Sequence, residues 1–151
     1  MSKATESDFN AFVKGSFSQI QQQYKNTPHI VVFWSETCAF CMKELAIFGR
    51  LIPQFPQVKL ITISTDPFLD DNTVQQILSS KKLEGTETWV FADDFAERLY
   101  FDVSPRWRGE LPLTYFFDRN NTMLKHMGIV KEAELVEWLN DQSLDITAVD
   151  K

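Results

Sequence analysis

Residues 30–41 read IVVFWSETCAFC, an apolar run followed closely by both cysteines of the chain, Cys38 and Cys41. The β-branched and aromatic residues of the run are typical of a central strand that is buried on both faces. A helix that begins at the cysteines would direct unpaired backbone N–H groups and the positive end of its dipole at the Cys38 sulfur, which favours thiolate over thiol. Cys41, one turn further along, is then within reach of Cys38 for a reversible disulfide.

The Cys-x-x-Cys spacing also occurs in zinc sites and in structural disulfides. A structural zinc ion takes four ligands, whereas this chain has no second cysteine pair, and His29 and His126 are not at ligand spacing. A disulfide that closes so short a loop removes little entropy from the unfolded chain, and 151 residues can bury a core without it. Redox chemistry is therefore the favoured interpretation of the pair.

The composition indicates one globular domain over residues 1–151, with a core at 7–140 and a polar tail at 141–151 that frays. A net charge of −6 leaves no basic patch for a nucleic acid or an anionic membrane, so we expect neither partner. No apolar stretch has membrane-spanning length, and the first six residues lack the apolar region of a secretory signal. Either the protein is cytoplasmic or a targeting segment has been removed.

Helical and strand patterns alternate along the chain, which predicts an α/β fold with a mixed sheet between helices. We expect helices over 9–24, 39–51, 72–83, 95–100 and 131–139, the first capped near Ser7-Asp8 and the third near Asn72-Thr73. We expect strands over 30–34, 58–64, 88–91, 114–117 and 122–127. The last two are joined by the turn-forming segment 118–121 and form a hairpin.

Further motifs accompany the cysteine pair. They are Phe33-Trp34-x-x-x-Cys38-x-x-Cys41 with Glu44 after it, the additional helix and strand between Asp66 and Phe91, Asp102-Val103-Ser104-Pro105, and Leu111-Pro112-x-Thr114. With these motifs the chain resembles the thioredoxin superfamily, and more closely its TlpA/ResA-like branch of extracytoplasmic thiol–disulfide oxidoreductases, over most of residues 7–140. The resemblance implies a thioredoxin-like fold with a helix–strand insertion and a C-terminal β-hairpin plus helix.

The resemblance also implies roles for the motif residues. Cys38 is then the attacking thiol, Cys41 the resolving thiol, and Pro112 a cis-proline that faces the pair. Glu44 follows Cys41 by three residues, so on a helix it shares a face with that sulfur and we expect it to exchange a proton with it. Val32 stands where thioredoxin carries its buried acid, which strengthens this expectation for Glu44.

We expect the substrate to contact residues around the two sulfurs. The candidates are Trp34, Thr37, Phe40, Leu111, Arg106 and Trp107. Thr37 stands where relatives commonly carry Trp. The segment 106–110 looks like an insertion whose two Arg and one Trp offer a partner cationic and aromatic contacts. The other interpretation is a plain connecting loop in which Trp107 covers the edge of the core.

The resulting hypothesis is a thiol–disulfide oxidoreductase with no cofactor beyond the Cys38–Cys41 disulfide, acting as a reductase of protein or metallochaperone disulfides. Its partners are a disulfide-containing protein and a thiol–disulfide electron donor, and a monomer is the default for a small domain. The resemblance places it in the periplasm or otherwise outside the cytoplasm, with an anchor removed. One alternative is a copper-binding or docking module without turnover, and another is a disulfide oxidase or isomerase. His126, on the last predicted strand, is expected to be a packed or edge histidine.

Overall fold

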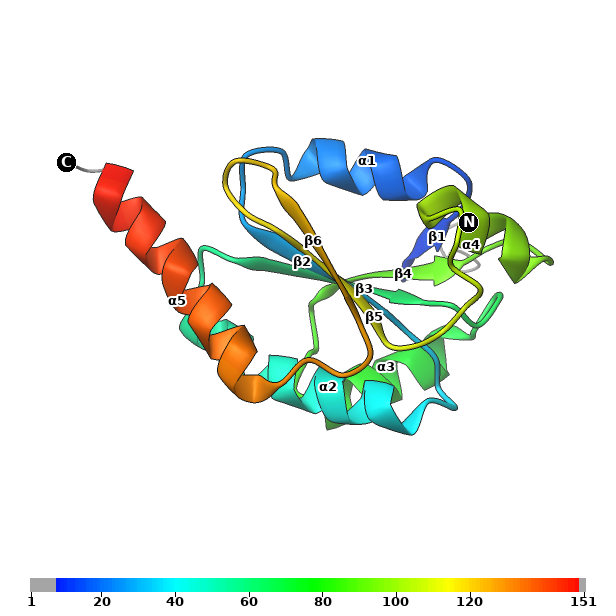
Figure 1. Cartoon of the computed structure of the whole chain (residues 1–151). Coiled ribbons are helices and arrows are strands. Elements are labelled where there is room, and N and C mark those ends of the chain that lie inside the picture. Colours follow the sequence, from blue (N-terminus) through cyan, green and yellow to red (C-terminus); the bar gives the residue numbers. More distant parts are fainter. Residues whose placement is uncertain (1–7, 150–151) are drawn as a thin grey trace.

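A six-stranded mixed sheet runs through the centre of the protein, with helices on both of its faces (Figure 1). The computed structural model describes residues 8–149, and their side chains as far as Ser143. The strands are β1 (Asn10–Phe12), β2 (His29–Trp34), β3 (Lys59–Ser64), β4 (Glu87–Phe91), β5 (Leu113–Phe117) and β6 (Met123–Met127). The helices are α1 (Ser16–Gln23), α2 (Ala39–Leu51), α3 (Asp71–Ser80), α4 (Ala96–Val103) and α5 (Glu132–Val149), and a 3-10 turn, η2, spans Ile52–Gln54.

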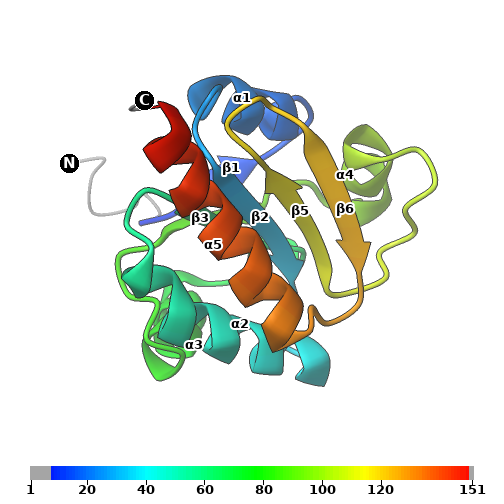
Figure 2. The same ribbon diagram turned by 60° about the vertical axis from the view of Figure 1, so that its left-hand side comes forward.

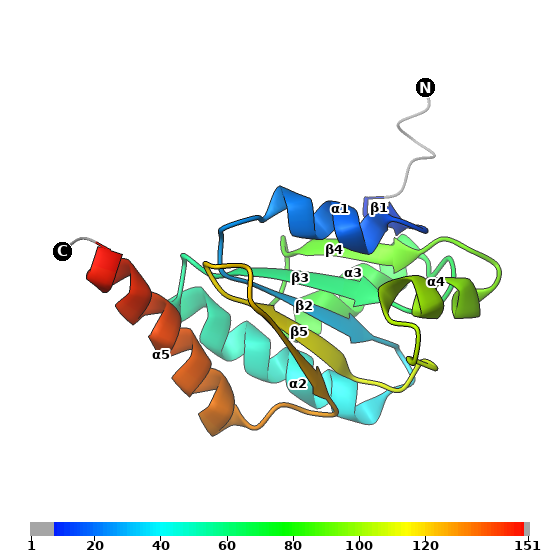
Figure 3. The ribbon, with the colours of Figure 1, turned by 45° about the horizontal axis from the view of Figure 1, so that its top comes forward.

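The strand order in the sheet is β1-β4-β3-β2-β5-β6. Strands β1, β4, β3 and β2 pair in parallel, whereas β5 is antiparallel to both β2 and β6. Because the parallel strands run in one direction, their carboxyl ends lie at one edge of the sheet, and from β2 the chain enters α2 at that edge (Figure 3). Open α/β sheets bind their ligands at this kind of edge.

Strand β2 lies between the two halves of the core, and all six of its residues are buried. Ile30, Val32 and Trp34 belong to the layer beneath α2, α3 and α5. Val31 and Phe33 belong to the opposite layer, beneath α1 and α4. The prediction of a central strand buried on both faces is therefore confirmed.

The predicted fold class is confirmed as well. The sheet is mixed and flanked by helices, α3 and β4 are the additional helix and strand, and the β5–β6 hairpin leads into a last helix that lies across the sheet (Figure 2). Helix α2 has the predicted bounds 39–51. The turn of the hairpin is closed by Asp118, whose Oδ1 accepts the N–H groups of Asn120 and Thr122, each at 2.9 Å.

The prediction of one long N-terminal helix was wrong. Residues 10–12 form β1, which pairs with β4 at the edge of the sheet, and α1 begins only at Ser16. Phe9, Phe12 and Val13 have helical spacing, but in a strand of three residues with one buried side chain there is no alternation to recognise. Gly15, with φ +92°, turns the chain between the two elements. The cap predicted near Ser7-Asp8 is not the cap of α1, whose N-cap residue is Gly15; Ser7 itself lies outside the described residues.

The bounds of the later helices also differ from the prediction: α3 ends at Ser80 rather than at residue 83, and α4 spans Ala96–Val103 rather than 95–100. Helix α3 begins at Asp71, and its cap is Asp70, whose carboxylate accepts the Thr73 N–H at 3.0 Å. Helix α5 continues to Val149, ten residues beyond the predicted end at 139. Gln142 is buried, and Ser143 accepts a hydrogen bond of 2.6 Å from the Gln57 side chain. These contacts hold residues 142 and 143 against the rest of the protein, although the apolar pattern of the helix ends at residue 139.

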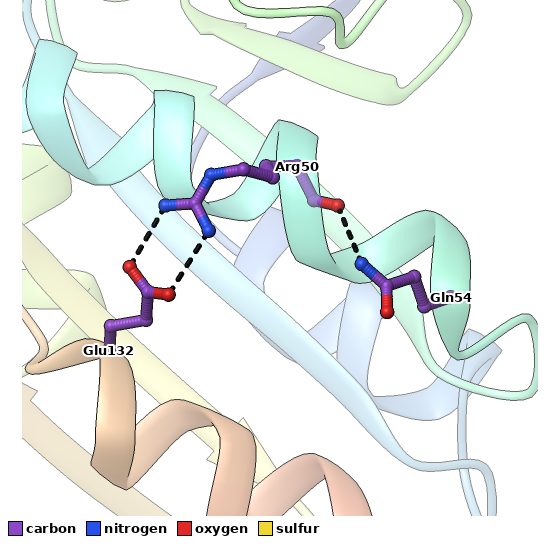
Figure 4. Close-up of polar contacts among 3 residues, drawn as sticks. All are labelled: Arg50, Gln54 and Glu132. Carbon is purple, nitrogen blue, oxygen red and sulfur yellow. Dashed lines mark hydrogen bonds and ion pairs between the residues drawn. The ribbon is translucent and has the colours of Figure 1, made fainter.

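An ion pair joins the end of α2 to the beginning of α5 (Figure 4). The Arg50 guanidinium donates to both carboxylate oxygens of Glu132, at 3.0 and 2.9 Å. Both side chains are about half exposed, so the pair contributes little to stability. Its effect is geometric, because it keeps the segment that precedes α5 beside α2.

Candidate functional site

The two cysteines lie at the beginning of α2. Cys38 is the N-cap residue, with extended backbone angles, and the helix starts at Ala39. The Cys38 sulfur accepts the backbone N–H of Cys41 at 3.1 Å, so it occupies the place of the usual capping oxygen. In this structure the two residues form a disulfide, with their Cα atoms 5.2 Å apart. The sulfur of Cys38 therefore lies at the positive end of the helix dipole, as the sequence predicts.

The two sulfurs differ in exposure. Cys38 is partly exposed, whereas Cys41 is completely buried in the layer beneath α2. An incoming disulfide can therefore reach Cys38 and not Cys41. This asymmetry matches the attacking and resolving roles that the family resemblance implies.

The segment 111–112 precedes β5, the antiparallel neighbour of β2. The Leu111–Pro112 peptide bond is cis, as predicted. Leu113, the next residue, pairs with Phe33 on β2, so Pro112 is placed beside the end of the strand from which Cys38 follows. The carbonyl of Pro112 accepts the Gly128 N–H at 2.8 Å, which ties this segment to the end of β6.

Glu44 is fully buried beneath the pair, one helical turn after Cys41. Its Oε1 accepts the Thr114 hydroxyl at 2.9 Å, and its Oε2 accepts the Val130 backbone N–H at 2.8 Å. Burial raises the pKa of this carboxyl, while the two hydrogen bonds and the charge of His126 act in the opposite direction. The site therefore contains a buried acid that keeps its proton to a higher pH than an ordinary glutamate.

Asp66, which the sequence indicated only as the start of the additional helix and strand, holds the loop before the cysteines. It follows β3, the parallel neighbour of β2, and its carboxylate accepts the Ser35 hydroxyl at 2.8 Å and the Glu36 N–H at 2.9 Å. The carbonyl of Ser35 in turn accepts the Cys38 N–H at 3.1 Å. An acidic residue two positions after a strand adjacent to β2 is the signal that could have identified it.

The expected substrate residues do not all reach the surface. Thr37 and Phe40 are exposed, with 58% of Phe40 accessible, and Leu111 is partly exposed. Trp34 is completely buried, because it is an inward-facing residue of β2. The expectation that Trp34 contacts substrate is corrected accordingly.

Trp107 also lies inside the molecule. It is 3% exposed, its ring packs on Phe33 and Tyr100 with centroids 4.9 and 4.8 Å apart, and its indole N–H donates to the Glu110 carbonyl at 2.8 Å. Gly109 has φ +93°, and a Cβ there would lie 2.7 Å from the Tyr100 ring, so the loop packs closely. Of the two interpretations of this segment, the one in which Trp107 covers the core edge fits the structure.

Arg106 and Arg108 remain exposed on this loop.

Within residues 8–149, no three His, Cys, Asp or Glu side chains gather where a metal ion could be held. No helix in that part of the chain combines the length and the apolar character needed to cross a membrane.

Comparisons with known proteins find similarity in structure only. No family model matches the chain, and no curated protein sequence is significantly similar to it. A secreted Mycobacterium tuberculosis disulfide oxidoreductase, described as homologous to E. coli DsbE, is similar in structure with a TM-score of 0.64 and 18% identity, over 80% of this chain and 85% of that chain.

Two further solved structures are similar to a comparable degree. A thioredoxin-related protein from Neisseria meningitidis has a TM-score of 0.61 and 18% identity, over 81% of this chain and 89% of that chain. A yeast mitochondrial 1-Cys peroxiredoxin has a TM-score of 0.61 and 16% identity, over 85% of this chain and 69% of that chain. At these identities the likeness establishes the fold, which confirms the fold predicted from the sequence.

The role of Asp66 can be tested by substitution with alanine. Asp66→Ala removes the acceptor of two hydrogen bonds that hold residues 35 and 36, so we expect the free energy of unfolding to fall by about 1–2 kcal/mol. Urea unfolding of the oxidised protein measures this change. Asp94→Ala, at an exposed position in the neighbouring loop, is the control and should change stability by less than about 0.5 kcal/mol. Equal effects of the two substitutions would contradict the role given to Asp66.

Proposed function

We propose that this chain, which has the thioredoxin-like fold, is a thiol–disulfide oxidoreductase in which Cys38 attacks and Cys41 resolves. One observation carries the proposal. The partly exposed Cys38 sulfur caps α2 and accepts the Cys41 N–H at 3.1 Å, while the Cys41 sulfur is buried behind it. A thiolate at this position is stabilised by the helix terminus and is accessible to a partner disulfide.

The reaction consists of two exchanges. The Cys38 thiolate attacks one sulfur of a substrate disulfide, forming a mixed disulfide and releasing the other substrate sulfur as a thiolate. The Cys41 thiolate then attacks the Cys38 sulfur, forming the Cys38–Cys41 disulfide and releasing the second substrate thiolate. Two electrons pass from the cysteine pair to the substrate. The helix terminus assists both exchanges, because it stabilises Cys38 as nucleophile and, in the reverse direction, as leaving group.

Glu44 supplies the proton acceptor for the second exchange. The buried Cys41 thiol must lose its proton before it attacks, and Glu44 is the carboxyl one turn further along the same buried helix face. Its ionised form is stabilised by the Thr114 hydroxyl and the Val130 N–H. Its pKa, raised by burial, brings its titration closer to neutrality, where a general base works best.

The substrate is a protein disulfide that approaches between the cysteines and the segment 111–112. Thr37, Phe40 and Leu111 are the accessible residues at this position, and we keep Arg106 from the neighbouring loop in the proposed contact surface. We propose that an extended substrate segment binds here through its backbone, in the way that an extended peptide pairs with an exposed sheet edge.

We further propose the direction and setting of the reaction. The chain acts as a reductase of protein or metallochaperone disulfides outside the cytoplasm, as a monomer that is itself reduced by a thiol–disulfide electron donor. The similar M. tuberculosis disulfide oxidoreductase is a secreted protein, which supports the extracytoplasmic setting.

Single cysteine substitutions test the reaction. We expect Cys38→Ser to abolish reduction of insulin disulfides, because it removes the nucleophile. We expect Cys41→Ser to accumulate the mixed disulfide, because the resolving thiol is gone; intact-protein mass spectrometry detects this species. With two cysteines in the whole chain, no other thiol obscures the result. Cu(I) binding by a wild-type protein that reduces no disulfide would favour the alternative of a copper-binding module.

The reduction potential of the Cys38–Cys41 couple tests the direction. A reductase should have a potential near that of thioredoxin, about −270 mV, and a strong oxidase one near about −120 mV. Redox titration against glutathione or dithiothreitol, followed by thiol alkylation, measures it. A value at the oxidising end of this range would replace the reductase assignment with the oxidase alternative.

Replacement of Glu44 by glutamine tests the proton acceptor. In the wild type the rate constant of the resolving step should rise as pH increases through the raised pKa of Glu44, because only the ionised carboxylate accepts a proton. In Glu44→Gln this inflection should disappear and the step should be about 100-fold slower at the plateau. Quenched-flow thiol alkylation measures the step. Glu36→Gln, at an exposed acid near Cys38, should keep the wild-type profile; an identical profile in Glu44→Gln would exclude the proton role.

A further inference from the structure

Glu44 has no direct route to water. It is completely buried, and each of its oxygens is bonded to a protein donor, the Thr114 hydroxyl and the Val130 N–H. In every turnover, however, a proton that it accepts must leave again. Some neighbouring group has to carry that proton between the buried carboxyl and solvent.

His126 lies next to this carboxyl. It pairs with Thr114 across the β5–β6 ladder, and directly opposed residues of an antiparallel pair project to the same face. That face is the one covered by α2, because the Thr114 hydroxyl bonds to Glu44 on it. The carboxyl and the imidazole therefore flank the same threonine, and the charge of His126 is near enough to lower the pKa of Glu44.

The imidazole is oriented by a backbone carbonyl. Its Nε2 lies 3.2 Å from the Ile129 oxygen, which can only accept, so Nε2 carries the hydrogen of this bond. In the neutral ring Nδ1 then has the free lone pair. The ring is partly exposed and lines a small pocket between β6 and α5, of about 70 Å³, together with Phe116, Leu124, Val130, Glu134 and Trp138. One histidine thus borders both the buried site and solvent.

Acidic side chains face the ring from two helices. Glu44 faces it from α2, and Glu134 faces it from α5 across the pocket. Lys125, its neighbour on β6, extends to Ser104 on the other side of the strand, and Arg50 of α2 is paired with Glu132. The two charged groups that face the ring, Glu44 and Glu134, are therefore both acidic.

We propose that His126 carries the proton of Glu44 to and from solvent. The inference rests on the proposed function. When Cys41 attacks the mixed disulfide, its thiol proton passes to the Glu44 carboxylate. The carboxyl then gives this proton to the free lone pair of His126, and the imidazolium releases it to water at the pocket. His126 touches neither sulfur, so it is a positioning residue for the proton and acts through Glu44.

The first test is a titration that needs no turnover. The Glu44 carboxyl is followed by carbon-13 NMR in the oxidised wild type and in His126→Gln, whose amide can still donate to the Ile129 carbonyl but cannot become charged. We expect the Glu44 pKa to rise by about one unit in the variant, because a favourable charge is lost. Lys125→Gln removes a charge from the same strand on the opposite face and should leave this pKa unchanged. No rise in His126→Gln, or an equal rise in both variants, would overturn the proposal.

The second test is chemical rescue of the resolving step. We expect His126→Ala to slow this step about tenfold, and added imidazole to restore it in proportion to the concentration of imidazole base. Imidazole should not restore Glu44→Gln, which lacks the group that receives the proton. A wild-type rate in His126→Ala without imidazole would refute the relay. If the wild type itself reduces no disulfide, the proposed function fails, and the NMR titration still decides whether His126 and Glu44 are coupled.

Discussion

The hydrogen bond from the Cys41 N–H to the Cys38 sulfur is the interaction on which the rest of the structure's chemistry depends. It exists because β2 ends at Trp34 and the chain turns directly into α2. Strand β2 cannot shift in register, since both of its faces are buried and a shift by one residue would exchange its two sets of side chains. Asp66 then fixes the connecting loop, so the sulfur is held at the helix terminus by both neighbouring elements.

Glu44 shows how the same layer supports proton chemistry. A carboxyl in an apolar layer is costly unless its oxygens are bonded, and here α2 contributes the acid while β5 and the β6–α5 connection contribute the donors. The raised pKa of Glu44 shows that the hydrogen bonds offset the desolvation of the carboxylate only in part. The ionised carboxylate therefore lowers the stability of the folded state. The Arg50–Glu132 ion pair lies close to this arrangement in the sequence. It ties the start of α5 to α2, two residues after Val130, whose N–H bonds to Glu44.

The fold alone does not define the reaction. Solved structures of similar shape include a disulfide oxidoreductase and a 1-Cys peroxiredoxin, at 18% and 16% identity. What distinguishes one chemistry from another is the site placed on the common scaffold. In this chain the site consists of two sulfurs of unequal exposure and one buried acid beneath them, an arrangement suited to exchange followed by resolution.

Sequence alone determined the features that depend on near neighbours: the buried strand, the cysteine spacing, the bounds of α2, and Glu44 one turn after Cys41. Periodicity and helix geometry act over a few residues, so these could be predicted. Tertiary structure decided what joins distant segments. Asp66 meets Ser35 across 31 positions, Val130 meets Glu44 across 86, and Trp107 turns inward because Phe33 and Tyr100 receive its ring. Those contacts depend on which strands become neighbours in the sheet, and no local pattern encodes that order.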